Sequence, residues 1–382
     1  METINMLRAA QATGLDLHVV VPGAMSPQSR LAHRAALPGV EMDFIPRRTG
    51  WRANLHLTPY LFASRPLPAG LLDRLRRRHA ENPYTAVLAI SYRTAPLSIA
   101  IARALGLPLL VRPHNVESQY FATLAGTSRF PRNLPYLAES FKLRRAEAGI
   151  HADPTVTAFA DIGERDAAWR RERTDRPVVF VPPFVGTIGS TDDRDGDDGE
   201  DLVCTSGELT LLFLGALDFV NNIDGIRWFV QRCWPALREG VDGRPVRLRV
   251  VGRNASAALV AELTAAGAEV LVDVPRVDPY LRAADVFVNP VRSGAGVNIK
   301  MIEAMSAALP VVSTSTGARG LPWRDGTELA IADEAGDFVA AVRALLVDAD
   351  RRAEMSSAAS EFVRTVLDPV AQMQRMRSAV GD

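Results

Sequence analysis

Residues 289–314, NPVRSGAGVNIKMIEAMSAALPVVST, carry the clearest local pattern in this chain. The stretch opens on the end of a short apolar run, VFVNP (286–290), and passes through two glycines into a segment with helical spacing. It then ends on the β-branched run PVVST (310–314). The pattern predicts a strand, a loop, a helix and a second strand. Such units build parallel sheets that are covered by helices on both faces.

The sequence around this stretch repeats the same alternation. Apolar runs at 210–217, 247–252 and 269–273 predict buried strands, and ELAIA (328–332) predicts another. Between the first two runs, one helical face carries Ile226, Phe229, Val230 and Trp234. Since parallel crossovers are right-handed, residues 209–360 are expected to form one Rossmann-like, doubly wound domain.

The first half alternates less regularly but predicts a second domain of the same kind over residues 1–185. Its expected strands are 15–23, 85–91, 107–113, 155–159 and 178–184. Residues 186–208, GTIGSTDDRDGDDGEDLVCTSGE, are rich in Gly, Asp and Ser and predict a solvated acidic linker. They lack the glycine and glutamate positions of an EF-hand loop, so no metal site is expected there.

Charge and length narrow the function class. The 382 residues suffice for two or three domains. Formal net charge is zero, from 44 basic and 44 acidic side chains, which argues against a dedicated nucleic-acid binder. The zero conceals an asymmetry: residues 1–186 have a net charge of +9 and residues 187–382 a net charge of −9. Lys300 is the only lysine of the acidic half.

Targeting signals are not found in the sequence. The start, METINMLRAAQATG, has no basic region followed by an apolar one. No apolar run approaches the ~20 residues of a spanning helix. Cys204 and Cys233 have neither metal nor redox spacing. These features predict a soluble, cytoplasmic protein.

The loop of 289–314 has the chemistry of an anion site. A glycine-containing loop that opens a helix, here with Gly294 and Gly296, presents free N–H groups and the positive end of the helix dipole to a phosphate. Lys300 adds a full charge in the first turn, and Glu303 lies on the same face one turn later, where it could bind a ribose diol. The alternative is a surface loop with an exposed Lys–Glu pair.

Taken together, these motifs resemble glycosyltransferase family four, the retaining GT-B enzymes. The resemblance covers about residues 85–375 and is most specific in 210–320. It rests on the 290–314 motif, on FLGALDFVNNIDGIRWF (213–229), on LRVVG (248–252) and on VDVPRVDPYLRAADVFVNP (272–290). RPHNVES (112–118) resembles an acceptor-domain segment of one branch. The resemblance implies an α/β GT-B fold, with two Rossmann-like domains facing a cleft and residues 361–382 packing back on the first.

The same resemblance implies roles for individual residues. The enzymes transfer a sugar from a nucleoside diphosphate to an acceptor hydroxyl and retain the anomeric configuration. Glu303 is then expected on the ribose and His114 near the transferred sugar, the alternative for His114 being an ordinary core or loop histidine. Asn222, which could instead simply start a helix, and Arg253 are expected at the donor site. The diphosphate is expected on Gly294, Ala295, Gly296, Val297 and Lys300.

The chain departs from the family pattern in three places. Many members carry an Arg and a Lys after the first donor-domain strand, where this chain reads ALDFVNN (216–222). Ala295 stands where the family has the first of two glutamates. The family also opens with a strand and a Gly-rich loop, whereas by this resemblance the sequence is expected to open inside the following helix. These departures motivate an alternative, a catalytically inactive GT-B homologue acting as a partner subunit.

The remaining expectations concern substrates, partners and place. The acceptor is not specified by the sequence; a lipid-linked acceptor in cell-surface polysaccharide or glycolipid biosynthesis, or an acceptor in secondary metabolism, fits the family. A basic first domain suggests peripheral contact with the anionic inner membrane face, the alternative being a merely solvated face. No metal and no cofactor beyond the nucleotide-sugar donor is expected. A third hypothesis, a nucleotide-sugar 2-epimerase, would need a carboxylate-rich cleft that the sequence does not reveal.

Overall fold

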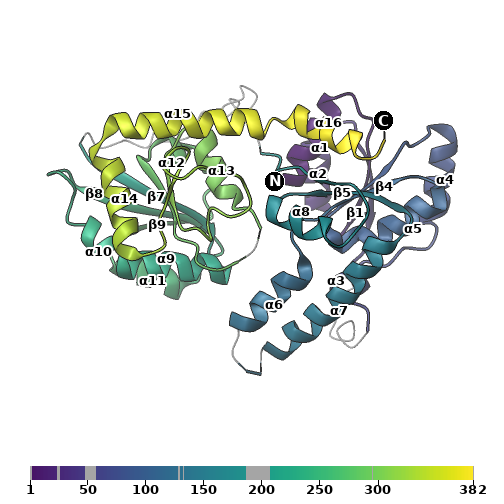
Figure 1. The fold of residues 1–382 in the computed structure, drawn as a ribbon, viewed down its shortest axis with the longest axis horizontal. Helices are drawn as coiled ribbons and strands as arrows, with labels where there is room; N and C mark the ends of the chain where they lie inside the picture. The colour runs from purple at the N-terminus through teal and green to yellow at the C-terminus, as the bar shows by residue number, and fades with distance from the viewer. Residues whose placement is uncertain are drawn as a thin grey trace. The chain divides into compact units, whose positions relative to one another are not determined.

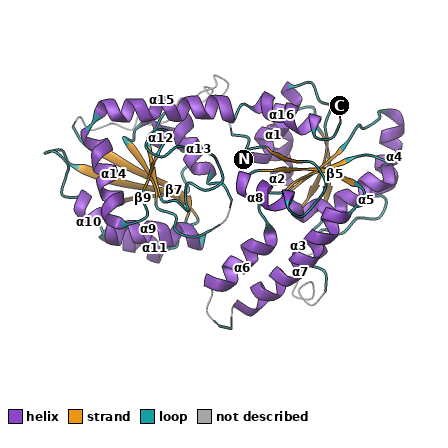
Figure 2. Ribbon diagram, viewed as in Figure 1, coloured by secondary structure: helices purple, strands orange, loops and turns teal. Residues whose placement is uncertain are grey.

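The computed structural model describes residues 2–23, 26–47, 57–127, 130–131, 133–185, 207–294 and 296–381. It divides into two compact units, each built around parallel strands (Figures 1 and 2). Unit 1 comprises Met1–Phe184 with Pro369–Asp382, and unit 2 comprises Val185–Asp368. Most of the predicted acidic linker, together with Cys204, lies outside the described residues.

Unit 1 contains a two-stranded parallel sheet, β1-β2, and a four-stranded parallel sheet, β3-β4-β5-β6. Its strands are β1 (His18–Pro22), β2 (Glu41–Ile45), β3 (Val87–Ile90), β4 (Leu109–Arg112), β5 (Val156–Asp161) and β6 (Val178–Phe180). Its helices are α1 (Glu2–Ala12), α2 (Pro27–Ala36), α3 (Tyr60–Ala63), α4 (Leu71–Glu81), the 3₁₀ helix η2 (Tyr92–Thr94), α5 (Ala95–Leu105), α6 (Glu117–Thr127), α7 (Asn133–Ala152), α8 (Glu164–Arg171) and α16 (Pro369–Ser378).

Unit 2 contains one six-stranded parallel sheet of order β12-β11-β10-β7-β8-β9. Its strands are β7 (Leu209–Ala216), β8 (Val246–Arg253), β9 (Glu269–Val272), β10 (Val286–Asn289), β11 (Val311–Ser313) and β12 (Ala330–Ile331). Its helices are α9 (Val220–Arg232), α10 (Trp234–Leu237), α11 (Ala257–Ala265), α12 (Asp278–Arg282), α13 (Ile299–Ser306), α14 (Ala335–Val347) and α15 (Ala349–Val366).

The strands of unit 2 are apolar throughout because both faces of the sheet are covered. Along β7, Leu211 and Phe213 pack into a core with α9, α11 and α14, whereas Leu212 and Leu214 pack into a second core with α12, α13 and α15. Successive strand residues point to opposite faces, so each apolar run supplies two cores. Burying each such side chain contributes roughly 1.5–3 kcal/mol.

Unit 1 follows the same rule around its four-stranded sheet. Leu110 packs with α1 and α16, whose buried methionines are Met6, Met373 and Met376. Its neighbour Leu109 points to the other face and packs with α5 and α7. The C-terminal helix is therefore part of the hydrophobic core of unit 1.

That returning segment starts later than the sequence suggested. We expected residues from 361 onward to join the first domain, but α15 continues to Val366 within unit 2. Phe362 packs against Trp323 in a tilted arrangement with ring centroids 4.4 Å apart, which holds the end of α15 to its own unit. The return begins at Pro369, which has no backbone N–H and readily starts a new helix.

Within the described residues, no helix is both long and apolar enough to cross a bilayer. The same residues contain no cluster of three or more His, Cys, Asp or Glu side chains suited to a metal ion. Cys233 is a buried free thiol whose pKa burial raises to about 12.

Candidate active site

The strand order of unit 2 locates its ligand site. β7 lies between β10 and β8, so the chain winds outward in one direction through β8 and β9 and in the other through β10, β11 and β12. In open parallel sheets, ligands bind beyond the carboxyl ends of the strands at the point where the winding direction changes. Here that point is the pair β7 and β10. Its loops lead into α9 and α13, which carry the predicted donor residues Asn222 and Lys300.

A direct hydrogen bond joins these two residues. Lys300 Nζ donates to Asn222 Oδ1 at 2.8 Å. Asn222 Nδ2 in turn donates to the carbonyl of Ala216, at the end of β7, at 3.0 Å. The ammonium also lies 4.6 Å from the centroid of the Phe213 ring. Lys300 is thereby held at the end of β7 by a neutral partner and an aromatic face.

Burial lowers the pKa of Lys300 to about 7. No carboxylate of the described residues forms an ion pair with it to offset this effect. A half-buried ammonium without a counter-ion can bind an anion favourably, since an incoming negative charge offsets the desolvation penalty.

The glycine loop before α13 is shaped by backbone geometry. Gly294 has φ 127° and Gly296 has φ 83°, conformations that favour glycine. The Gly294 carbonyl accepts a hydrogen bond of 3.3 Å from Arg319 Nη1. Val297 packs against Gly320, where a Cβ atom would lie 2.6 Å from Val297 Cγ2. Ala295 lies outside the described residues.

The N-terminus of α13 is not capped by its own side chain. Asn298, at the N-cap position, instead donates to the Gly317 carbonyl at 2.7 Å. The first N–H groups of a helix have no acceptor within it, so this end of α13 can bind an anion.

Glu303 follows Lys300 by one turn and is half-buried. Burial and the nearby charge of Asp278 raise the pKa of its carboxyl group, while Arg253 acts in the opposite direction. No hydrogen bond to this carboxylate is formed within the described part of the chain. Arg253 ends β8 and is exposed. Both residues remain available to a ligand.

Three features of this site were not predicted as parts of it. Arg319 braces the glycine loop, and Asn221 lies against Gly294. Gly225 lets α9 approach β10: a Cβ atom there would lie 2.7 Å from the Pro290 carbonyl oxygen. Arg292, three residues beyond the end of β10, lies over the Trp228 ring at 4.8 Å. Sequence patterns did not indicate any of these contacts.

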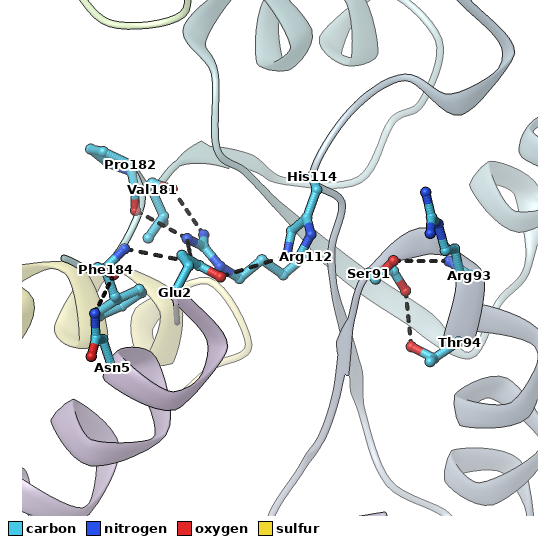
Figure 3. A network of polar contacts seen from close by, with 10 residues as sticks. All are labelled: Glu2, Asn5, Ser91, Arg93, Thr94, Arg112, His114, Val181, Pro182 and Phe184. Atoms are coloured by element: carbon cyan, nitrogen blue, oxygen red, sulfur yellow. Dashed lines mark hydrogen bonds and ion pairs between the residues drawn. The ribbon is translucent and has the colours of Figure 1, made fainter. Parts of the chain in front are cut away.

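In unit 1, His114 follows β4 and lies beside a buried ion pair (Figure 3). Its Nε2 is 3.6 Å from Glu2 Oε2, and burial lowers its pKa. Arg112 is fully buried and donates to Glu2 Oε1 and Val181 O, both at 2.8 Å, and to Pro182 O at 3.0 Å. Burial therefore favours the neutral form of His114, which lies next to the Arg112–Glu2 ion pair.

The neighbouring strand ends in a strained residue. Ser91, directly after β3, has φ 101°, an unfavourable conformation for a residue with a side chain. Its N–H donates to Arg112 O at 3.0 Å, and its Oγ accepts from Arg93 N at 3.3 Å (Figure 3). Strain of this kind concentrates at functional sites. Sequence patterns gave no signal for it.

Part of the chain is similar in sequence to known proteins. Residues 208–348 match the family model described as glycosyl transferases group 1. An uncharacterized 44.6 kDa protein in the cps region of Klebsiella pneumoniae is 32% identical over 134 residues. That alignment covers 32% of this chain and 34% of the relative, so the match spans about a third of the relative's length.

Solved structures match almost the whole chain. HepE from Anabaena, in complex with UDP and glucose, has a TM-score of 0.64 at 13% identity and covers 98% of this chain and 94% of its own. WaaG, a glycosyltransferase involved in lipopolysaccharide biosynthesis, has a TM-score of 0.62 at 14% identity, with 100% and 95% covered. A glycosyltransferase from Rickettsia africae has a TM-score of 0.66 at 9% identity, with 100% and 95% covered. The chain thus has the GT-B fold, and its residues 208–348 match the glycosyl transferases group 1 model.

Proposed function

We propose that this protein is a retaining glycosyltransferase, which moves a sugar from a nucleoside-diphosphate sugar to an acceptor hydroxyl. The observation that carries the proposal is the half-buried Lys300 ammonium, fixed by Asn222 where the winding direction of the unit 2 sheet changes. Sugar transfer leaves a diphosphate whose developing charge must be stabilised. Lys300, the N-terminus of α13 and the loop around Gly294 and Gly296 supply that stabilisation.

The other donor residues take complementary roles in this proposal. Glu303 accepts hydrogen bonds from the ribose hydroxyls, since its carboxylate is half-buried and without a hydrogen bond in the described structure. Arg253, exposed at the end of β8, adds charge near the diphosphate. His114 of unit 1 lies near the transferred sugar and, being neutral, exchanges hydrogen bonds with its hydroxyls. No metal or further cofactor is required, because the positive charge comes from protein groups.

The biosynthetic setting follows from what related proteins are reported to do. WaaG is involved in lipopolysaccharide biosynthesis, and the Klebsiella relative comes from a cps region. We propose a role in cell-surface polysaccharide or glycolipid biosynthesis, with UDP-sugars as the first donors to test because HepE binds UDP-glucose. Secondary-metabolite biosynthesis is the other setting that the fold serves.

We also propose a cytoplasmic location with peripheral attachment to the anionic membrane face. The support is an exposed stripe on α7, made of Leu134, Leu137 and Phe141, of which Phe141 is 75% exposed. The exposed Arg144 and Arg145 lie on the two sides of this stripe at helical spacing. Apolar side chains flanked by arginines suit the boundary between lipid headgroups and acyl chains.

The test has a binding arm and a turnover arm. Isothermal titration with UDP, GDP and ADP, with and without EDTA, measures donor recognition. We expect one nucleotide to bind, unaffected by EDTA, and Lys300→Met to weaken it. Failure of all three nucleotides to bind, or loss of binding in EDTA, would contradict the proposal.

A turnover measurement distinguishes an active glycosyltransferase from the alternative, an inactive homologue that acts as a partner subunit. That alternative is favoured by the absence of a cation in residues 216–222, where many family members carry two. Incubation with a panel of sugar nucleotides should release free nucleoside diphosphate by slow hydrolysis, even without an acceptor. Tight nucleotide binding with no release from any donor would instead support the inactive homologue.

A further inference from the structure

Unit 1 contains a second group of cationic side chains that the proposed donor chemistry does not use. Arg47 follows β2, Arg65 follows α3, and Arg93 lies in η2 directly after β3. All three are half-buried. α3 and η2 pack against each other, and Phe62 of α3 contributes to the same core as Tyr92. Three guanidinium groups therefore gather at the carboxyl ends of the β2 and β3 strands.

The arginines of this cluster, defined as Arg47, Arg65 and Arg93, have few anionic partners. Arg93 pairs with buried Glu117 at 3.2 Å. Arg65 Nη1 donates only to neutral groups, Leu61 O at 2.6 Å and Ser64 Oγ at 3.0 Å. Arg47 Nη2 reaches the Tyr60 hydroxyl at 3.5 Å, and its buried Nε has no hydrogen-bond partner among the described residues.

The surrounding charges leave an excess of positive charge. Tyr60 N donates to Glu139 Oε2 at 3.0 Å, and Glu139 is paired with Lys142. Among the described residues, four cations, the cluster and Lys142, thus face two carboxylates, Glu117 and Glu139. Burial and the neighbouring charges of Arg47 and Arg93 lower the pKa of Arg65 to about 10, so these groups act on one another.

A structural role accounts for other buried arginines of unit 1 but not for this cluster. Arg170 is held by two hydrogen bonds to Asp161, at 2.8 and 3.0 Å, within an aromatic cage. Arg112 is held by Glu2 and two carbonyls. Arg47 and Arg65 form no ion pair with any carboxylate of the described residues. Gathering like charges without partners destabilises a fold, so such an arrangement is retained where a ligand neutralises it.

We propose that Arg47, Arg65 and Arg93 bind a phosphate-type oxyanion carried by the acceptor. A phosphate monoester has nearly two negative charges at neutral pH, which matches the excess of two positive charges, and the planar guanidinium fork suits its oxygens. Arg93 and His114 follow the neighbouring strands β3 and β4. An acceptor anchored by its phosphate therefore lies at the strand ends that also carry His114. This inference rests on the proposed function in one respect, namely that the molecule carrying the phosphate is the acceptor of the sugar.

The test measures phosphate binding to the full chain with its donor site filled by UDP. The probes are inorganic phosphate, a sugar 1-phosphate and a short-chain prenyl phosphate below its critical micelle concentration, with glucuronate as a singly charged carboxylate. If UDP does not bind, the same titrations are run on Lys300→Met, which lacks the cation of the proposed donor site. Phosphate binding to the arginine cluster is then measured even if the proposed donor site is wrong. We expect phosphate probes to bind at least tenfold more tightly than glucuronate.

Substitutions in the cluster test whether phosphate binds there. Arg65→Gln and Arg47→Gln should each weaken phosphate binding at least tenfold, whereas Arg77→Gln, at an exposed position of α4, should change it less than twofold. Unchanged UDP affinity and circular dichroism would show that the variants fold. No phosphate binding by the wild type, equal binding of glucuronate, or full binding by Arg65→Gln would overturn the inference. A preference for the prenyl phosphate over the sugar phosphate would identify the carrier as a lipid.

Discussion

Lys300 Nζ donates a hydrogen bond of 2.8 Å to Asn222 Oδ1, joining the first turns of α13 and α9 across 78 positions of the sequence. The Asn222 amide is itself oriented by its bond to Ala216 O, so its oxygen faces the ammonium. Because the partner is neutral, it positions Lys300 without cancelling its charge. A carboxylate in the same place would hold the lysine equally well but would repel a diphosphate.

Removing or neutralising this charge should weaken donor binding. Hydrogen bonds to charged groups contribute about 1.5–3 kcal/mol, so Lys300→Met should weaken nucleoside-diphosphate binding roughly 10- to 150-fold. Asn222→Asp, which keeps the shape, should weaken it as well because the new carboxylate competes for the ammonium. Titration calorimetry measures both. Arg238→Met, at an exposed position of the same unit, serves as the control; equal affinities for all variants would remove Lys300 from the site.

The pKa of Lys300 predicts a dependence of binding on pH. With a folded pKa of about 7, the ammonium is charged below pH 7 and loses its proton as the pH rises. Affinity for the diphosphate should therefore decline above pH 7, by up to about tenfold per pH unit. The decline ends at the pH where the ammonium of the bound protein also loses its proton. Calorimetry from pH 6 to pH 9 tests this. Lys300→Met should have a much flatter profile, and a wild-type profile as flat as that of the variant would contradict the assignment.

The lowered pKa of Lys300 also makes the stability of the fold depend on pH. The pKa of an unfolded lysine stays near 10.5, so between pH 7 and 10.5 the unfolded chain binds more protons at this position than the folded one. The contribution of Lys300 to stability therefore rises with pH across that window and is most unfavourable below pH 7. Comparing urea midpoints of the wild type and Lys300→Met at pH 6.5 and 9.5 isolates this contribution.

Much of unit 2 could be predicted from the sequence because its strands are buried on both faces. Runs such as 210–217 contain little but apolar residues, and the structure places β7 at Leu209–Ala216. The glycine loop and Lys300 were predictable because they are adjacent in the sequence. In unit 1, α2 has no fully buried residue and β2 mixes polar with apolar residues, so neither had a distinct pattern.

Contacts between distant segments could not be predicted. Asn222 was expected at the donor site by resemblance, but nothing in its neighbourhood indicates that it binds Lys300. Likewise, the approach of Glu2 to His114 depends on how α1 packs on the sheet, which local periodicity does not encode. Such pairs arise from tertiary packing, to which propensity and spacing are insensitive.

The close approach of α9 to β10 predicts that Gly225 is required. A Cβ atom at this position would lie 2.7 Å from Pro290 O and 3.3 Å from Val291 Cα, both rigid backbone atoms. Gly225→Ala should therefore destabilise the fold by roughly 1–3 kcal/mol despite the higher helix propensity of alanine. Gly336 of α14 has no atom within 4 Å of its Cβ position. Gly336→Ala is the matched control and should leave stability unchanged or raise it by up to about 1 kcal/mol in urea denaturation.

His114 should affect sugar transfer but not donor affinity. It belongs to unit 1, whereas Lys300, Asn222 and Glu303 belong to unit 2. If His114 stabilises the transferred sugar in the transition state, His114→Ala should lower the rate of donor hydrolysis about 100-fold or more. UDP affinity should stay within twofold. His33→Ala, at a half-buried histidine of α2, controls for general effects; an unchanged rate in His114→Ala would assign His114 a merely structural role.

The stripe on α7 predicts binding to anionic membranes. Leu137 is 50% and Phe141 75% exposed, and replacing both by glutamine removes apolar area without disturbing the buried face of the helix. The double variant should sediment less with vesicles containing phosphatidylglycerol, and Arg144→Gln with Arg145→Gln should lose the dependence on anionic lipid and on salt. Leu31→Gln, on the exposed face of α2, is the matched control, as Leu31 is 66% exposed. Equal sedimentation of the wild type and both double variants would mean that α7 does not contact the lipid surface.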